Sequence, residues 1–233
     1  MSELLGVGLY SVQQAASLLG APVRDLDRWL FGYKRKYSGK DRFHAPIWKP
    51  LVRIEKAKCL SFYDLIEARF VNHFARQNVS LQHIRLAWET AKVEFNVDFP
   101  FSSFNFLTDG RRIFQQARDQ MSDSEERLYD VAAKQSVFVP VIKPSLYGSI
   151  QFGAKGEVER WYPMSHSKRV VLNPRVGFGQ PTIDHHGVPT QALAAAFAAE
   201  GSIRRVARTF EVAAEDVKAA VKFESELNNG RTT

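Results

Sequence analysis

The 233-residue sequence predicts an α+β protein, and two patterns point to this class. Amphipathic segments with apolar residues at helical spacing occupy the N-terminal part and the C-terminal end of the chain. Short alternating segments, separated by Gly, Pro and Asp, lie between them and are typical of β-hairpins. We therefore expect three regions, at residues 1–97, 98–169 and 170–227.

The composition is that of an ordinary globular protein, with 45% hydrophobic and 24% charged residues. Cys59 is the only cysteine, so neither an internal disulfide nor a cysteine-rich zinc site can form. No uncharged apolar stretch approaches the roughly 20 residues that span a bilayer, and the first residues lack the basic leader of a signal peptide. These observations predict a cytoplasmic protein that does not enter a membrane.

Two short helices are expected near the N-terminus. The first begins at Ser11, which forms a capping box with Gln14, and it ends at Gly20. Its apolar face repeats at helical spacing in Val12, Ala15, Ala16 and Leu19. The second helix covers residues 22–30, and its expected inner stripe is Val23, Leu26 and Leu30. Two such helices joined by a tight turn with glycine predict a helix-turn-helix unit.

The positive charge of the chain is concentrated next to this unit. Residues 24–58 carry eleven basic and four acidic side chains, a difference that equals the net charge of +7 of the whole chain. Within this block, residues 33–43 (YKRKYSGKDRF) turn at Ser38-Gly39, which predicts the β-wing of a winged helix-turn-helix. A localised excess of positive charge indicates a polyanionic partner such as nucleic acid. A solvated, lysine-rich loop is the alternative.

The outer face of the second helix and the wing contain the residues expected to contact DNA. An arginine on the helix can bind guanine with both arms of its guanidinium, and an aspartate can accept from cytosine or orient a neighbouring arginine. Basic residues of the wing can bind backbone phosphates. The alternative is an ordinary amphipathic helix, and Trp29 is expected in the core. The predicted DNA-binding residues are Arg24, Asp25, Arg28, Lys34, Arg35, Lys36, Lys40 and Arg42.

Two longer helices begin the middle of the chain. The first spans residues 60–77 with Ser61 as its cap, and the second runs from Ser80 to about residue 94. Residues 78–85 are similar to the helical part that follows the wing in MerR-type regulators. Further on, Asp109-Gly110 predicts a β-hairpin over residues 104–115, and residues 149–162 predict a second one. Residues 137–142 predict an edge strand.

The C-terminal region is expected to contain a strand, a Gly- and Pro-rich loop and a second strand over residues 170–183. Three helices should follow, at residues 190–201, 202–210 and 213–224. The segments NPRVGFGQPTI and EGSIRRVARTFEVAAEDVKAAVKFE resemble the small antitoxin domain known as domain of unknown function 433. The whole chain, with RWYP at residues 160–163, resembles the longer VapB-like antitoxins, which place a winged helix before this domain.

This resemblance implies a type II toxin–antitoxin system. The chain would neutralise a PIN-like VapC-type ribonuclease toxin and repress the shared operon by binding operator DNA. The active site of such a toxin is an acidic, metal-dependent pocket, and an inserted arginine could pair with its carboxylates. The candidate toxin-binding residues are Arg175, Arg204, Arg205 and Arg208.

The segment Asp184-His185-His186-Gly187-Val188-Pro189 departs from the family, which usually has Gly-Thr-Arg before the Pro. An Asp-His-His cluster could bind a metal ion, and a polar loop is the alternative. We expect the loop, and we expect no metal and no cofactor.

The three C-terminal helices also form a helix-turn-helix-like pattern, but residues 202–224 have a net charge of only +1. We therefore expect the N-terminal block to bind DNA, as a homodimer that places two reading helices about one DNA turn apart. A MerR-like, ligand-sensing transcriptional regulator is the alternative function. An enzyme is not expected, because the sequence has no nucleophile–base motif, phosphate-binding loop or H-E-x-x-H motif.

Overall fold

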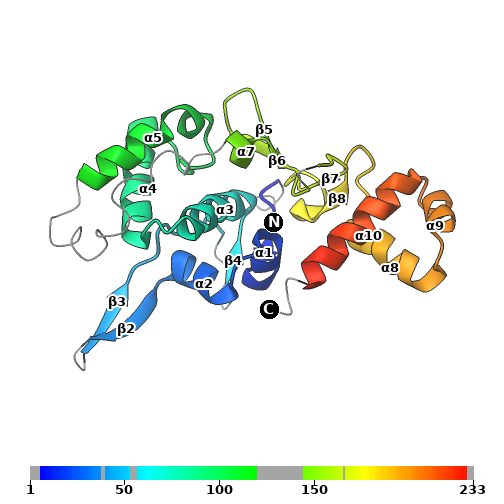
Figure 1. The fold of residues 1–233 in the computed structure, drawn as a ribbon, viewed down its shortest axis with the longest axis horizontal. Coiled ribbons are helices and arrows are strands. Elements are labelled where there is room, and N and C mark those ends of the chain that lie inside the picture. Colours follow the sequence, from blue (N-terminus) through cyan, green and yellow to red (C-terminus); the bar gives the residue numbers. More distant parts are fainter. Residues whose placement is uncertain (1–5, 38–39, 53–56, 120–143, 165, 230–233) are drawn as a thin grey trace.

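A computed structural model describes residues 6–37, 40–52, 57–119, 144–164 and 166–229. The molecule is elongated, with a projecting β-hairpin (residues 33–44) at one end and the last helices (residues 190–229) at the other (Figure 1). Short antiparallel strand pairs accompany the helices, which confirms the α+β class. The turn predicted at residues 38–39 and the strand predicted at 137–142 lie outside the described residues. Within those residues, no helix combines the length and the apolar character needed to cross a membrane.

The N-terminal helix-turn-helix and wing have the predicted form. Their elements are β1 (Tyr10–Ser11), α1 (Val12–Leu19), α2 (Val23–Phe31), β2 (Tyr33–Tyr37), β3 (Lys40–His44) and β4 (Cys59–Leu60). The Ser11 side chain accepts from the Gln14 N–H and the Gln14 side chain accepts from the Ser11 N–H, so the capping box is complete. Gly20 ends α1 in the left-handed conformation. Trp29 is buried as expected, whereas Val23 is exposed at the start of α2.

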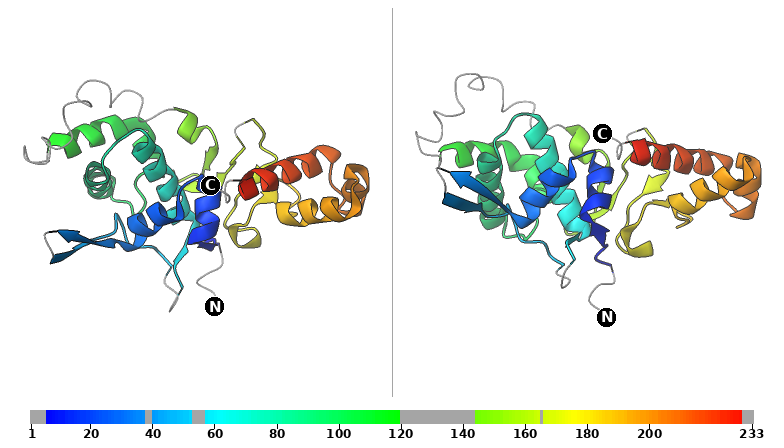
Figure 2. Two further views of the ribbon diagram at one scale, coloured as in Figure 1. Left: turned by 60° about the horizontal axis from the view of Figure 1, so that its bottom comes forward. Right: turned by 90° about the horizontal axis from the view of Figure 1, so that it is seen from below.

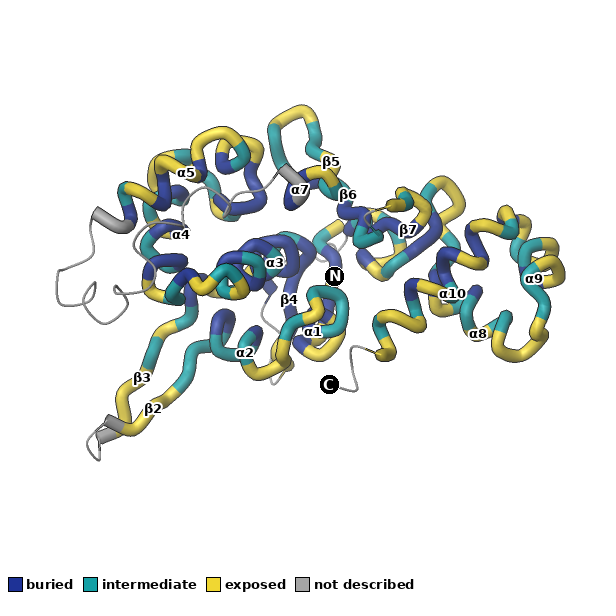
Figure 3. The backbone as a smooth tube through the Cα atoms, viewed as in Figure 1, coloured by how far each residue is buried: buried dark blue, intermediate teal, exposed yellow. Residues whose placement is uncertain are grey.

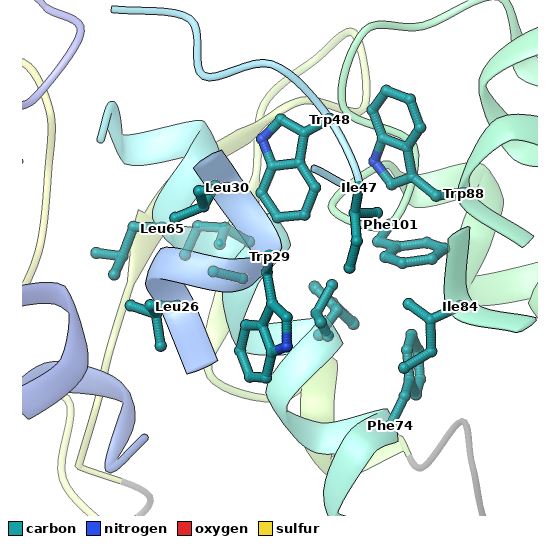
Figure 4. Packing of buried hydrophobic residues seen from close by; sticks show 14 of the residues in the cluster. Leu26, Trp29, Leu30, Ile47, Trp48, Leu65, Phe74, Ile84, Trp88 and Phe101 are labelled. Atoms are coloured by element: carbon teal, nitrogen blue, oxygen red, sulfur yellow. The ribbon is translucent and has the colours of Figure 1, made fainter. Parts of the chain in front are cut away.

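Helices α3 (Phe62–Arg76) and α4 (Leu81–Phe95) begin where the sequence predicts. Ser61 caps α3 in a capping box with Asp64, and the Ser80 side chain caps α4. The apolar face of α3 belongs to the main hydrophobic core, in which side chains of α2 and α4 pack with it (Figure 4). The fully buried residues of this face are Phe62, Leu65, Ile66, Phe70 and Phe74.

The β-hairpin predicted for residues 104–115 is wrong, because this segment lies in helix α5 (Phe104–Asp119). The Asp109-Gly110 pair forms no turn, and Gly110 lies on the buried side of the helix. Local turn propensity is overridden by the aromatic core, since the buried positions follow each other at intervals of three or four residues. They are Phe106, Gly110, Ile113, Phe114 and Ala117.

The second predicted hairpin is present, and the C-terminal region has its own hydrophobic core. The remaining elements are α7 (Pro144–Tyr147), β5 (Ile150–Phe152), β6 (Val158–Trp161), β7 (Val170–Val171), η2 (Gly177–Gly179), β8 (Thr182–Ile183), α8 (Thr190–Glu200), α9 (Ile203–Thr209) and α10 (Ala214–Asn229). Strand β5 pairs with β6 and β7 with β8, both antiparallel. Helices α8, α9 and α10 enclose the C-terminal core as the sequence predicts, with buried Leu193, Val206, Val217 and Phe223.

Two carboxylates of α3 are fully buried and bind two tryptophans. Asp64 Oδ1 accepts from Trp48 Nε1 at 2.8 Å, and Glu67 Oε2 accepts from Trp88 Nε1 at 2.8 Å. The other oxygen of Glu67 accepts from the Ser102 N–H at 2.8 Å, and the two indoles stack with their centroids 6.1 Å apart. Burial raises the pKa of Glu67 to about 7, although the hydrogen bonds that it accepts oppose this shift.

We predict that Glu67 makes the stability of the protein depend on pH. Its pKa is about 7 in the folded state against 4.5 for an unperturbed glutamate, so the folded state binds the proton more tightly. The free energy of unfolding contributed by this group is therefore highest below about pH 4.5 and falls as the pH rises through about 7. A Glu67→Gln variant cannot ionise and should lose this part of the dependence.

Urea unfolding of the wild type and of Glu67→Gln at a series of pH values measures the difference. Glu89→Gln, which changes an exposed carboxyl of α4, is the matched control and should keep the wild-type curve. If the free energies of unfolding of the wild type and of Glu67→Gln change with pH in parallel, the prediction is contradicted.

Candidate nucleic-acid interface

Helix α2 presents two arginines in different surroundings. Arg24 is exposed near the start of the helix, and among the described residues no ion pair of its guanidinium is found. Arg28, one turn further on, is only partly exposed and lies 3.8 Å from the Asp25 carboxylate. The Asp25 carboxylate therefore lies beside an arginine of its own helix. Of the two arginines, Arg24 is the more exposed.

The other acidic residue of α2 is neutralised from outside the helix. Lys58 Nζ lies 2.5 Å from Asp27 Oδ1 and 5.0 Å from the centroid of the Phe31 ring. Both acidic groups on the outer part of α2 thus have basic partners within the molecule. The negative charge that the sequence places beside Arg24 and Arg28 is therefore largely compensated, which reduces its repulsion of a polyanion.

A stack of side chains joins α2 to the base of the wing. The rings of Tyr33 and His44 are stacked with their centroids 4.6 Å apart and their planes at 6°. The Arg28 guanidinium lies over the Tyr33 ring at 4.3 Å, within the range of a cation–π interaction. Sequence reasoning missed this stack, although the aromatic residues at the two ends of the basic hairpin were a possible signal.

Gly32 makes the connection between α2 and the wing possible. Its φ of +76° lies in the left-handed region, and a Cβ at this position would come within 2.5 Å of the His44 carbonyl oxygen. A larger residue would therefore push β3 away from the end of α2. The direction in which the wing projects thus depends on this glycine.

The wing separates its basic residues onto two faces. The register of the hairpin places Arg35 opposite Arg42 and Lys36 opposite Asp41. Directly opposite residues in an antiparallel pair share a face, and neighbours along a strand alternate between faces. Arg35 and Arg42 therefore lie on one face, and Lys36 lies on the other face together with Lys34.

The two faces differ in their electrostatics. Arg35 and Arg42 are like charges placed directly across the ribbon, so positive charge is concentrated on this face. On the other face, Lys36 lies across from an acidic residue and Lys34 across from Phe43. Lys34, Arg35, Lys36 and Arg42 are all exposed, and the hairpin extends away from the rest of the molecule (Figure 3). Lys40 pairs in register with Tyr37 close to the tip.

The four candidate toxin-binding arginines are all exposed, but the structure does not gather them into one surface. Arg204, Arg205 and Arg208 lie on α9, which caps the far end of the α8–α10 pair. Arg175 lies in the loop after β7, where its Nη1 is 3.8 Å from Glu159 Oε1 of β6. Figure 2 shows that β7 and β8 lie at the end of the α8–α10 pair that is opposite to α9. The candidates therefore form two separate groups.

The Asp184-His185-His186 segment forms the turn after β8. Asp184 accepts hydrogen bonds from Tyr162 Oη at 3.2 Å and from Arg160 Nη1 at 3.4 Å, while His185 is exposed. Within the described residues, no group of three or more His, Cys, Asp or Glu side chains has an arrangement that could hold a metal ion. The segment therefore forms a polar turn whose Asp184 carboxylate is bonded to residues of β6 and the segment after it.

Two family models match the two ends of the chain. Residues 8–88 match the model described as "Putative DNA-binding HTH domain", which covers the helix-turn-helix, the wing and most of α4. Residues 170–223 match the model described as "Protein of unknown function (DUF433)". The second match begins at β7 and ends in α10, and it includes the segment NPRVGFGQPTI and all but the last residue of the segment EGSIRRVARTFEVAAEDVKAAVKFE.

Relatives of full length support the same organisation. A protein of Mycobacterium tuberculosis (strain ATCC 25618 / H37Rv) named "Putative antitoxin VapB45" is 25% identical over 226 residues, which are 92% of this chain and 93% of that protein. The crystal structure of Rv2018 from Mycobacterium tuberculosis covers 93% of this chain and 99% of its own, with 24% identity and a TM-score of 0.69. At that identity the structural likeness establishes the fold alone. The resemblance is thus confirmed: the chain joins an N-terminal region that matches a helix-turn-helix family model to a C-terminal region that matches the DUF433 model, and over nearly its whole length it is similar to a protein named "Putative antitoxin VapB45".

Proposed function

We propose that this chain is the antitoxin of a type II toxin–antitoxin pair. It represses its own operon by binding operator DNA, and it neutralises a PIN-like VapC-type ribonuclease by direct contact in the cytoplasm. It acts by binding and not by catalysis, and as a homodimer. The similarity to the relative named "Putative antitoxin VapB45", which extends over 92% of this chain, supports this proposal.

The main support for DNA binding by this chain is the arginine pair on one face of the wing. Arg35 and Arg42 face each other on a projecting hairpin beside a helix-turn-helix, in a chain whose positive excess is confined to this region. Such a concentration of exposed positive charge is suited to binding the phosphates of a polyanion. In this proposal the wing binds phosphates and α2 enters the major groove, where Arg24 contacts base edges.

The toxin-binding half of the proposal belongs to the C-terminal region, at residues 170–227. This region has a separate hydrophobic core and lies at the end of the molecule away from the wing (Figure 1). The separation would let one chain hold DNA and a protein partner at the same time. The surface that contacts the toxin includes one of the two groups of exposed arginines, because an arginine can pair with carboxylates of an acidic metal site.

We predict that the two faces of the wing contribute unequally to DNA affinity. A double variant Arg35→Ala/Arg42→Ala should bind all duplex sequences more weakly and reduce the slope of log affinity against log salt by about 2, since each phosphate contact contributes roughly 0.9. The matched variant Lys34→Ala/Lys36→Ala should reduce this slope less, because Lys36 lies across from Asp41. Binding titrations with a mixed-sequence duplex at several salt concentrations test this. Equal slopes for the two double variants would refute the assignment of faces.

We predict that Arg24 and Arg28 act differently. Arg24→Ala should leave the melting temperature unchanged and relax base preference at one operator position, at a cost of about 1–3 kcal/mol in discrimination. Arg28→Ala should lower the stability of the free protein by about 1 kcal/mol, because it removes the contact with the Tyr33 ring. Binding to single-base operator variants, together with melting temperatures, separates the two effects. Loss of stability in the Arg24 variant would show that its side chain supports the fold instead.

We predict that the chain co-purifies with the product of a neighbouring gene that encodes a small ribonuclease. Co-expression should also restore growth to cells that the nuclease alone inhibits, because the bound antitoxin blocks the active site. Expression of the nuclease with an empty plasmid is the control. The antitoxin function is wrong if the nuclease remains lethal in the presence of this chain and separates from it during purification.

A further inference from the structure

The loop between β7 and β8 presents an aromatic side chain in an unusual backbone conformation. Gly177, Phe178 and Gly179 have φ values of +53°, +55° and +81°, so three consecutive residues lie in the left-handed region. Glycine adopts this region without strain, but a bulky side chain does so only at a cost in free energy. Phe178 is therefore the strained member of the three.

The side chain of Phe178 is not packed in a hydrophobic core, so core contacts do not offset the free-energy cost of this strain. It is 64% exposed, in a chain whose other phenylalanines fill the main core in large number. Folding alone would favour glycine or asparagine at this position, because both tolerate a positive φ and neither exposes an aromatic ring. An exposed aromatic residue held in a strained conformation is instead typical of a functional surface.

The DNA-binding region fixes the conformation of this loop. The Leu9 N–H donates to the Phe178 carbonyl oxygen at 3.1 Å, and the buried Tyr10 hydroxyl donates to the Gly179 carbonyl oxygen at 2.6 Å. A Cβ at position 179 would lie 2.4 Å from Tyr10 Oη, so the close approach requires glycine there. The loop is therefore held in place in the free protein, and such pre-organisation lowers the entropic cost of binding.

Two other exposed side chains belong to the segments that meet at Phe178. Leu9, whose N–H donates to the Phe178 carbonyl, is 41% exposed, and the side chain of Arg175, three residues earlier in the same loop, is 72% exposed. A cavity of about 120 Å³, lined among others by Leu9, Gln180 and Pro181, opens next to the loop. Aromatic residues and arginine provide most of the binding energy in protein–protein interfaces, usually as anchors that enter a pocket of the partner. We refer to Phe178, Leu9 and Arg175 as the 178 patch.

We infer that the 178 patch is the centre of the surface that binds the toxin, and this inference rests on the proposed antitoxin function. Phe178 enters an apolar pocket of the ribonuclease, and Arg175 pairs with a carboxylate at the edge of that pocket. A metal-dependent ribonuclease supplies such carboxylates, which complement the charge of Arg175. The three arginines of α9 lie at the far end of the α8–α10 pair and are outside this centre.

Other occupants fit the 178 patch less well. DNA is disfavoured because Arg175 is the only basic residue of the patch, whereas DNA-binding surfaces gather several basic residues. A second copy of the chain is disfavoured because a two-fold contact would bring the Arg175 side chains of both copies, which carry the same charge, to the same patch. The patch is thus better suited to be the anchor of a larger contact with a different protein.

The substitution Phe178→Gly tests this inference, because it should change stability and binding in opposite directions. Glycine relieves the strain at a positive φ, so the melting temperature of the purified full-length chain should stay the same or rise. Affinity for the neighbouring-gene ribonuclease, measured by titration calorimetry, should fall by at least about tenfold. Val93→Ala, which shortens an 82% exposed side chain of α4, is the control and should keep wild-type affinity.

A second comparison separates the two groups of arginines. Arg175→Ala should weaken binding of the ribonuclease, whereas the triple variant Arg204→Ala/Arg205→Ala/Arg208→Ala should retain wild-type affinity. If the wild-type chain does not bind the ribonuclease, the antitoxin function itself fails. If the wild type binds and Phe178→Gly binds equally well, or if only the α9 triple variant loses affinity, the 178 patch is not the binding centre.

Discussion

Helix α3 lies inside the molecule, so its polar side chains must find their partners within the protein. Each of four such side chains contacts a different segment of the chain. Asp64 binds Trp48 after the wing, Glu67 binds Trp88 of α4, Arg69 donates to the Leu146 carbonyl, and Asn72 donates to the Leu19 carbonyl at the end of α1. The positions of the helix-turn-helix, the wing, α4 and the central hairpin therefore all depend on the burial of this one helix.

The contacts around α3 explain how a strongly charged wing can keep a fixed position while it projects from the rest of the molecule. The wing has little core of its own, and its exposed faces are strongly basic. It is held at its base, where Gly32 allows close approach, Tyr33 and His44 stack, and the Arg85 guanidinium donates to the Ala45 carbonyl. The contacts at the base thus hold in position a basic surface that is suited to an anion.

The features that depend on local chemistry could be predicted from the order of the amino acids. Capping residues such as Ser11, Ser61 and Ser80, the glycines after helices, and the position of the charged block all predict what the structure contains, because they act within a few residues. The DUF433 region was recognised in the same way, from a local pattern. The basic residues near the helix-turn-helix could likewise be identified from the order of the amino acids alone.

The contacts between these residues follow from the folded structure and could not be predicted from local patterns. The Asp109-Gly110 pair predicts a turn locally, yet aromatic packing against α3 and α4 makes it part of a helix. The register of the wing separates Arg35 from Lys34 and Lys36, the Tyr33 ring engages Arg28, and the backbone of the 177–179 loop exposes Phe178. These outcomes depend on contacts between segments that are distant in the chain, and local sequence patterns contain no information about such contacts.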